Sequence, residues 1–181
     1  MAPAKTEVVI LSGRRSLRHF QFNIADEVID SRESVKYLGV VFGRNCNMAV
    51  HLRYASNRAL AMLQKLRWVL PNIGGARASK RRVMASAIHF VLLYGAAVWY
   101  DALTVKQNLK LLESVQRQTA IAVASAYRTV STVAVQVVAG VIPIDILAFR
   151  NKRRYEEQPV SEAELLDLWQ DRCTGQERPG G

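Results

Sequence analysis

The sequence predicts an α+β fold that is mainly α, in which a small N-terminal antiparallel β segment is followed by a bundle of helices. Up to about residue 43, short runs of β-branched and aromatic residues are separated by turn-forming residues, as strands are. From Asn47 onward, apolar residues recur three, four and seven positions apart, which is the period of amphipathic helices. Half of the 181 residues are hydrophobic, so the chain can bury a core and is not expected to be disordered.

The strand predictions rest on short local patterns. Thr6–Leu11 is rich in β-branched residues, and His19–Ile24 alternates apolar and polar positions as a half-buried strand does. Val28-Ile29 is a candidate for a very short strand. Val35–Phe42 reads as a further strand, and Gly39 inside it indicates a bulge or a close approach by another backbone.

The helix predictions rest on periodicity and on capping residues. Asn47 is a candidate N-cap, Pro143 suits a first helical turn, and Ser161 with Glu164 forms a capping box. The expected helices are 47–70, 76–101, 105–126, 131–138, one from 143 that ends in the basic run 150–154, and a short one from 161 to 169.

The positive charge is concentrated in the body of the chain. The formal net charge is +10 and the isoelectric point is about 10.1. Between Ser34 and Arg154 there are 18 Lys and Arg residues against three acids, whereas the segment from Ser161 to Gly181 is acidic. A folded basic face of this kind indicates a polyanionic partner, either nucleic acid or an anionic membrane surface.

The sequence gives no indication that this chain alone catalyses a reaction or binds a metal. Nucleotidyl transfer needs clustered carboxylates to hold two divalent metals, and Asp26, Asp30, Asp101 and Asp145 are isolated in the sequence. The three histidines have no partner at metal-ligand spacing, and the two cysteines form no zinc motif and no disulfide framework.

One apolar run requires a decision between membrane and core. Val83–Trp99 has no formally charged residue, but its 17 residues fall short of the roughly 20 that a spanning helix needs. We interpret it as a helix buried in a protein core, with Tyr94 and Trp99 packing inside.

The basic clusters are the strongest functional signal from the residues themselves. One set lies along the first helix and another opens the second helix, where backbone N–H groups also favour phosphate. The predicted nucleic-acid-binding residues are Lys36, Arg53, Arg58, Lys65, Arg67, Arg77, Lys80, Arg81 and Arg82.

Five blocks, in the same order along the chain, resemble one known family. These blocks are Lys5–Leu11, Val35–Val40 (V-K-Y-L-G-V), His51 with the helix after it, Leu92–Trp99 (L-L-Y-G-A-A-V-W), and Gln116-Arg117 with Ala126–Ser131 and Ala139–Ile144. They resemble the end of the palm, the primer grip, the thumb and the post-thumb segment of non-LTR (LINE-type) retrotransposon reverse transcriptases, of the arthropod Jockey-like lineage. Y-L-G-V alone is a weak signal, whereas five ordered blocks from Lys5 to Tyr155 are a strong one.

The resemblance implies a division of the chain and a role for each part. It implies a palm remnant with the primer-grip hairpin over residues 1–45, a helical thumb over 46–126, a post-thumb helical segment over 127–158 and an acidic tail over 159–181. Tyr37, Leu38 and Gly39 would form the primer grip, and the partner would be an RNA template/DNA primer duplex. The family's catalytic aspartates would lie upstream of Met1, so no catalytic residue, metal ligand or cofactor is expected in this chain, and Mg²⁺ is expected only for the full-length parent enzyme.

The resemblance and the composition leave other interpretations open. The chain alone is expected to be inactive as a polymerase, and it resembles a truncated or decayed copy of the parent gene. The alternative is a non-catalytic helical module that docks on a protein or associates with a membrane through its apolar helices. We expect an intracellular location, in nucleus or cytoplasm, because no signal peptide is recognised in the sequence.

Overall fold

The computed structural model describes residues 6–12, 20–24, 27–69 and 78–174. It confirms an α+β fold that is mainly α, with short strands followed by helices. The strands are β1 (Val8–Val9), β2 (Gln21–Ile24), β3 (Glu27–Arg32), β4 (Ser34–Tyr37) and β5 (Val40–Gly43). The helices are α1 (Ala49–Val69), α2 (Ala78–Leu92), α3 (Ala96–Trp99), the 3₁₀ helix η3 (Tyr100–Thr104), α4 (Lys106–Ala124), α5 (Thr132–Ala139), α6 (Ile144–Tyr155) and α7 (Glu162–Thr174).

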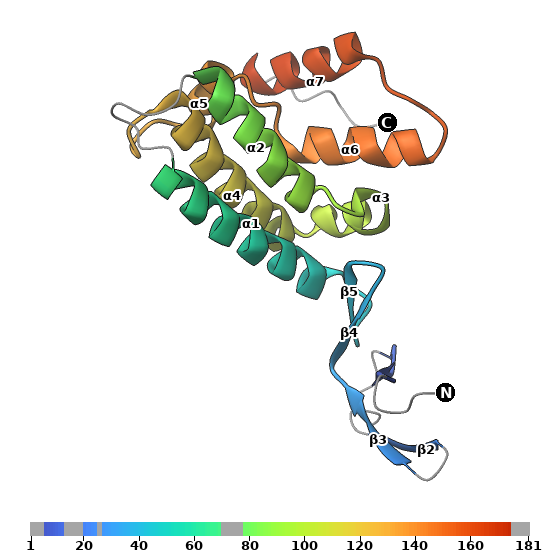
Figure 1. Cartoon of the computed structure of the whole chain (residues 1–181). Coiled ribbons are helices and arrows are strands. Elements are labelled where there is room, and N and C mark those ends of the chain that lie inside the picture. The colour runs from blue at the N-terminus through green and yellow to red at the C-terminus, as the bar shows by residue number, and fades with distance from the viewer. Residues whose placement is uncertain (1–5, 13–19, 25–26, 70–77, 175–181) are drawn as a thin grey trace.

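The strands form two small sheets. β2 and β4 each pair antiparallel with the strand that follows them, β3 and β5, while β1 runs parallel to β3. Figure 1 shows β2 and β3 at the end of the molecule farthest from α7, with the β4–β5 hairpin between them and the helices. Phe20, which directly precedes β2, and Val28 in β3 are more than half exposed, so this outer sheet contributes little to the core.

The helices enclose the main core. α1, α2 and α4 pack against one another, and α6 packs on α3, η3 and α4. The fully buried apolar side chains of this core include Leu52, Ile88, Leu92, Trp99, Leu112, Val115 and Ile144. Each buried side chain of this size contributes about 1.5–3 kcal/mol relative to exposure, so the helical body carries most of the burial. A second apolar cluster, around Ala120, Val135 and Ala139, joins α5 to α4.

A buried polar residue ties the later helices to the bundle. The Gln116 side chain on α4 is completely buried, and its Nε2 donates to the Ile142 carbonyl at 2.8 Å. Its Oε1 accepts hydrogen bonds from Gln136 Nε2 at 3.0 Å and from the Ile144 backbone N–H at 2.9 Å. Leaving such buried groups unpaired is costly, so this network fixes how α5 and the start of α6 sit on α4.

Two predicted elements are interrupted in the structure. The helix expected over 76–101 breaks after Leu92, because Gly95 adopts a left-handed conformation (φ 66°) and the chain resumes as α3 and η3. The strand expected over 35–42 is a hairpin of two strands, because Leu38 and Gly39 both have positive φ (45° and 85°). Two positive φ values in a two-residue loop define a type I′ turn, which matches the twist of paired strands.

The remaining helix predictions are close to the structure. The Ser131 and Ser161 side chains cap α5 and α7 by accepting from Ala134 N and Glu164 N, both at 3.2 Å. α7 runs to Thr174, five residues beyond the predicted end at Trp169.

The membrane alternative rests on apolar length. Within the described residues no single helix is long and apolar enough to cross a membrane, although two bent pairs are by length and composition: Ser79–Leu92 with Ala96–Thr104, and Thr132–Ala139 with Ile144–Tyr155. Trp99 in the first pair is fully buried, as predicted, but Tyr94 is 46% exposed, which corrects its expected place in the core.

Candidate nucleic-acid interface

The β4–β5 hairpin presents two exposed side chains at its tip. Tyr37 is 64% and Leu38 is 76% exposed. Behind them, the Tyr94 hydroxyl donates to the Leu38 carbonyl at 2.9 Å. A Cβ atom on Gly39 would lie 2.6 Å from Cε1 of the Tyr94 ring, so a larger residue does not fit without movement. The close approach predicted at Gly39 therefore exists, but the approaching group is the Tyr94 ring and not a second backbone.

A buried histidine fastens the hairpin to α1. The His51 Nδ1 accepts a hydrogen bond from the Val41 backbone N–H at 3.2 Å, and His51 is almost completely buried. Burial lowers the pKa of His51, although the backbone of Tyr94 acts in the opposite direction. His51 is therefore a neutral positioning residue that holds the hairpin against the helices.

A cationic cluster lies where β4 meets α1. Lys36 Nζ is 3.0 Å from the Tyr54 hydroxyl and 5.3 Å from the centroid of its ring. The Arg58 guanidinium carbon lies 5.7 Å from the same centroid. The hydrogen bond from Lys36, together with the charge of Arg58, lowers the pKa of Tyr54. The Tyr54 ring thus holds two cations of the predicted set side by side through cation–π contacts.

The basic residues of α1 lie on two sides of the helix. Arg58 and Lys65 are about two turns apart and share one exposed side, next to the Lys36 cluster. Arg53 and Arg67 share another side. Arg67 Nη2 donates to the Gln118 carbonyl of α4 at 3.1 Å, so Arg67 also braces two helices. The predicted set on α1 is therefore two stripes and not one.

The basic residues of α2 also divide. Lys80 and Arg82 are exposed, whereas Arg81 is partly buried and lies in a small hollow shared with Arg67. Arg77, also predicted to bind nucleic acid, lies outside the described residues. The structure thus brings Lys80 and Arg82 to the surface at the start of α2 and turns Arg81 toward the bundle.

Two of the three acids of the body form ion pairs away from these cations. Asp101 contacts Lys152 of α6 at 2.6 Å, and Asp145 forms a two-pronged ion pair with Arg172 of α7. The hydrogen bonds that Arg172 donates to the Asp145 carboxylate raise the pKa of Arg172, with a smaller contribution from the charge of Glu113. Among the described residues, no carboxylate lies within salt-bridge distance of Arg53, Arg58, Lys65, Lys80 or Arg82.

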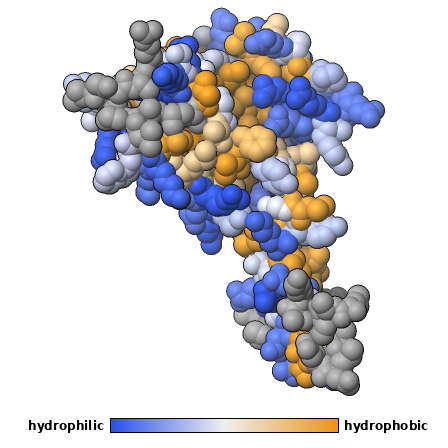
Figure 2. Space-filling view, in the orientation of Figure 1, coloured by the Kyte–Doolittle hydropathy of each residue, from blue (hydrophilic) through white to orange (hydrophobic). Residues whose placement is uncertain are grey.

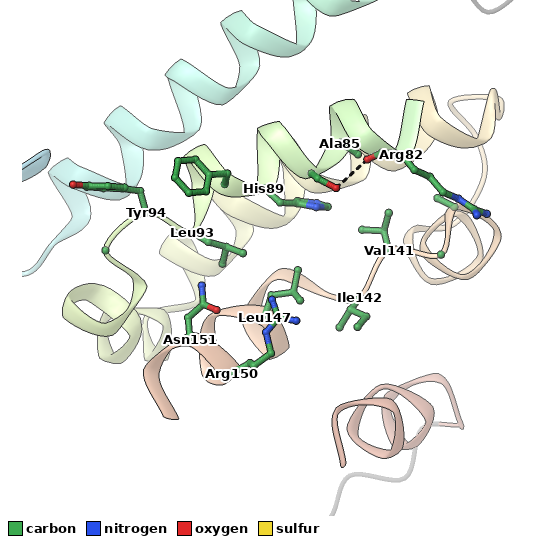
Figure 3. A pocket seen from close by; sticks show the side chains of 15 residues that line it. Arg82, Ala85, His89, Leu93, Tyr94, Val141, Ile142, Leu147, Arg150 and Asn151 are labelled. Carbon is green, nitrogen blue, oxygen red and sulfur yellow. Dashed lines mark hydrogen bonds between the residues drawn. The ribbon is translucent and has the colours of Figure 1, made fainter. Parts of the chain in front are cut away.

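A groove opens on another side of α2. It lies between α2, the Ala139–Ile142 segment and α6, and has a volume of about 610 Å³. Figure 3 shows His89 of α2 and Leu93, which directly follows α2, facing Ile142 and Leu147 across it. Figure 2 shows apolar side chains gathered over the middle of the helical body, with hydrophilic side chains on either side.

Two features of this surface were missed by sequence analysis. Tyr54 was not among the predicted binding residues, although its position four residues before Arg58 could have indicated a cation–π pair. Arg150 was read only as part of a basic run, and its place on the groove depends on how α6 packs, which no local pattern reveals.

The described residues form no candidate metal site. The described segments contain no group of three or more His, Cys, Asp or Glu side chains that could hold a metal ion. The two described histidines are engaged otherwise, His51 with the hairpin and His89 beside Gln116 at 3.4 Å.

Comparisons with known proteins give a consistent set of relatives. The chain is 27% identical over 177 residues to a retrovirus-related Pol polyprotein from the type-1 retrotransposable element R1 of Nasonia vitripennis, covering 90% of this chain and 52% of that protein. It is 29% identical to a putative 115 kDa protein in the element R1DM of Drosophila melanogaster, covering 82% of this chain and 14% of that protein. A probable RNA-directed DNA polymerase from transposon BS of Drosophila melanogaster is 25% identical, over 50% of this chain and 10% of that protein.

These matches cover most of this chain but only part of its relatives. The chain spans about half the length of two of the R1 polyproteins from Nasonia vitripennis, at 52% and 47%. No protein-family model and no solved structure matches the chain significantly. The ordered blocks in the sequence and the similarity over about nine tenths of its length agree, and the chain is a relative of the Pol polyproteins of R1-type non-LTR retrotransposons.

Proposed function

We propose that this chain is the primer-grip and thumb part of a reverse transcriptase and that it binds the backbone of a template–primer duplex. A relative named as a probable RNA-directed DNA polymerase and several Pol polyproteins support a polymerase context. The catalytic carboxylates and Mg²⁺ belong, under this proposal, to the full-length parent enzyme. The chain alone is expected to bind a duplex and not to extend it.

The observation that carries the proposal is the set of unpaired cations on β4, α1 and α2. Lys36 and Arg58 gather on Tyr54, and Lys65 continues the same side of α1. Cations without carboxylate partners are free to neutralise phosphates and release counterions, which favours binding to any nucleic acid. Phosphate contacts of this kind fix the position of a duplex and carry no sequence information.

The hairpin supplies the second part of the proposal. Its exposed Tyr37 and Leu38 are backed by the Tyr94 ring and fastened through His51, so the tip is held firmly. A rigid tip with exposed side chains is suited to hold the end of a primer strand at a fixed place. An RNA–DNA duplex is A-like, so shape and 2′-OH contacts are expected to matter more than base edges.

The test is a fluorescence-anisotropy titration of the whole chain with a labelled RNA–DNA hybrid at low and moderate salt. The double variant Arg58→Gln/Lys65→Gln removes two charges from the proposed surface, and we expect it to weaken binding roughly fivefold or more at low salt. The matched control, Lys106→Gln/Lys110→Gln, removes the same charge from exposed positions on α4.

Three outcomes would contradict the proposal. They are no binding of the hybrid at low salt, an equal loss in both double variants, and incorporation of dNTPs by the chain alone when primer, template and Mg²⁺ are supplied. The first two concern the binding surface, and the third concerns the assignment of chemistry to the rest of the parent enzyme.

A further inference from the structure

The groove between α2 and α6 has a charge pattern that the duplex-binding surface does not explain. Arg82 of α2 and Arg150 of α6 both line it, and Figure 3 shows them coming from these two elements. Neither guanidinium has an ion-pair partner among the described residues, and no carboxylate lines the groove. The groove is therefore complementary to a polyanion.

The titratable group inside the groove adds no charge at neutral pH. Burial lowers the pKa of His89 to about 4, so its imidazole is neutral near pH 7. Its Nε2 lies 3.4 Å from Gln116 Nε2, on the α4 side. The two arginines are thus the charged groups that face an occupant.

The walls and rim of the groove are apolar and aromatic. Leu93, Val141 and Leu147 line it together with Phe90. Phe90 is 72% exposed, and Tyr94, on the rim toward the hairpin, is 46% exposed. An aromatic ring exposed beside unpaired arginines is the combination that single-stranded nucleic acids use, because bases stack on the ring while phosphates meet the cations.

We propose that this groove binds an unpaired, single-stranded segment of nucleic acid, with Arg82 and Arg150 on phosphates and Phe90 stacking on a base. The inference rests on the proposed function, since it assumes a nucleic-acid partner, and it deepens it by assigning a separate place to a single strand. A duplex does not fit this role, because its bases are stacked inside and cannot reach Phe90.

The test compares two labelled ligands on the same preparations of the whole chain, a 12-nucleotide oligouridine RNA and the RNA–DNA hybrid. Phe90→Ala removes an exposed ring, so the fold should be retained, and circular dichroism checks this. We expect Phe90→Ala to weaken oligouridine binding about fivefold to tenfold and to change hybrid binding by less than about twofold. Arg150→Gln is expected to act in the same direction on oligouridine.

Two control variants match these changes outside the groove. Trp68→Ala removes a 90% exposed aromatic side chain from α1, and Arg154→Gln removes a charge from an exposed position on α6. Both are expected to leave oligouridine binding within about twofold. Ultraviolet cross-linking of a 4-thiouridine version of the RNA, mapped by mass spectrometry, should place the cross-link in the peptide that contains Phe90.

The failures of the two proposals are distinguishable. If oligouridine binding falls equally in Phe90→Ala and Trp68→Ala, or if Phe90→Ala weakens hybrid binding as much as oligouridine binding, the groove is not a single-strand site, while duplex binding stands. If a peptide of alternating Glu and Leu competes with oligouridine at the groove and binds more tightly than the RNA, the occupant is an acidic protein segment and the inference is wrong. If neither nucleic acid binds at low salt, both proposals fail.

Discussion

The same kinds of basic residue have different electrostatic surroundings on α1 and α2 (Arg58, Lys65 and Lys80) and on α6 and α7 (Lys152 and Arg172). On α6 and α7, Lys152 contacts Asp101 and Arg172 contacts Asp145, so their charges hold elements together. On α1 and α2, Arg58, Lys65 and Lys80 have no carboxylate partner among the described residues. The difference teaches that the total charge of this chain says less about binding than the places where acids are absent.

The largest expected effect comes from changing Gln116, whose buried side chain on α4 lies beside His89 of α2 and is hydrogen-bonded to α5 and the start of α6. Gln116→Leu keeps the volume but leaves the Ile142 carbonyl, the Ile144 N–H and the Gln136 amide without their partner. We expect it to lower the free energy of unfolding by about 3 kcal/mol in urea titrations. Gln107→Leu, at an exposed position on the same helix, should change it by less than about 0.5 kcal/mol. Equal effects of the two variants would show that the network does not join the regions.

The second-largest expected effect is a loss of stability at acid pH. It should originate in α1 and α2, because each contains a histidine, whereas α6 and α7 contain none. The pKa of His89 is about 4 in the folded chain, below its ordinary value near 6.5. As the pH falls below 6.5, the unfolded chain therefore binds a proton at His89 that the folded chain excludes. The contribution of neutral His89 to the free energy of unfolding is complete above pH 6.5 and is lost as the pH falls toward 4. At pH 5 we expect a loss of about 2 kcal/mol relative to pH 7.

The control for this prediction is His89→Gln, which keeps a polar side chain beside Gln116 and removes the titrating group. In this variant, the loss of stability between pH 7 and pH 5 should be smaller by most of the contribution of His89. His51, whose pKa is also lowered, still contributes in the same direction. An unchanged pH dependence in the variant would mean that His89 has the same pKa in the folded and the unfolded chain, and would contradict this prediction.

The smallest expected effect concerns the ion pair between Asp145 and Arg172, which joins α6 to α7. Asp145→Asn removes the partner of Arg172, a pair that is partly exposed, so we expect a loss of about 1 kcal/mol of stability. Affinity for an RNA–DNA hybrid should not fall, because this pair lies outside the proposed surface. Asp167→Asn, an exposed acid on α7, is the matched control. A fall in hybrid affinity for Asp145→Asn alone would place α6 and α7 inside the binding surface.

Local patterns in the sequence predicted much of the helical fold. Periodicity located most of the helices, and the predicted cap at Ser161 is present. The break at Gly95 was missed because the run around it is apolar on both sides, and the choice between a straight helix and a turn depends on packing. Gly39 was read as a strand glycine, although the glycine and the leucine before it form the turn of a hairpin.

The candidate site was harder to predict because its decisive contacts are distant in sequence. Lys152 and Asp101 are 51 positions apart, as are Arg67 and Gln118, so no local pattern shows which cations are neutralised or used as braces. The sequence correctly marked the body as basic, but it could not separate Arg82, which faces the groove, from Arg81, which turns inward. The roles of Tyr37, Leu38 and Gly39 in holding a primer remain a prediction from the resemblance.

The central claim is that the unpaired cations of α1 and α2 bind the nucleic-acid backbone. Its most direct test is the dependence of hybrid affinity on salt for the whole chain and for the fourfold variant Arg53→Gln/Arg58→Gln/Lys65→Gln/Lys80→Gln. We predict that the slope of log affinity against log salt becomes shallower by about 3 in this variant, and by much less in a control with Lys106, Lys110, Arg128 and Arg154 changed to Gln. Identical slopes in the two variants, or a larger change in the control, would contradict the claim.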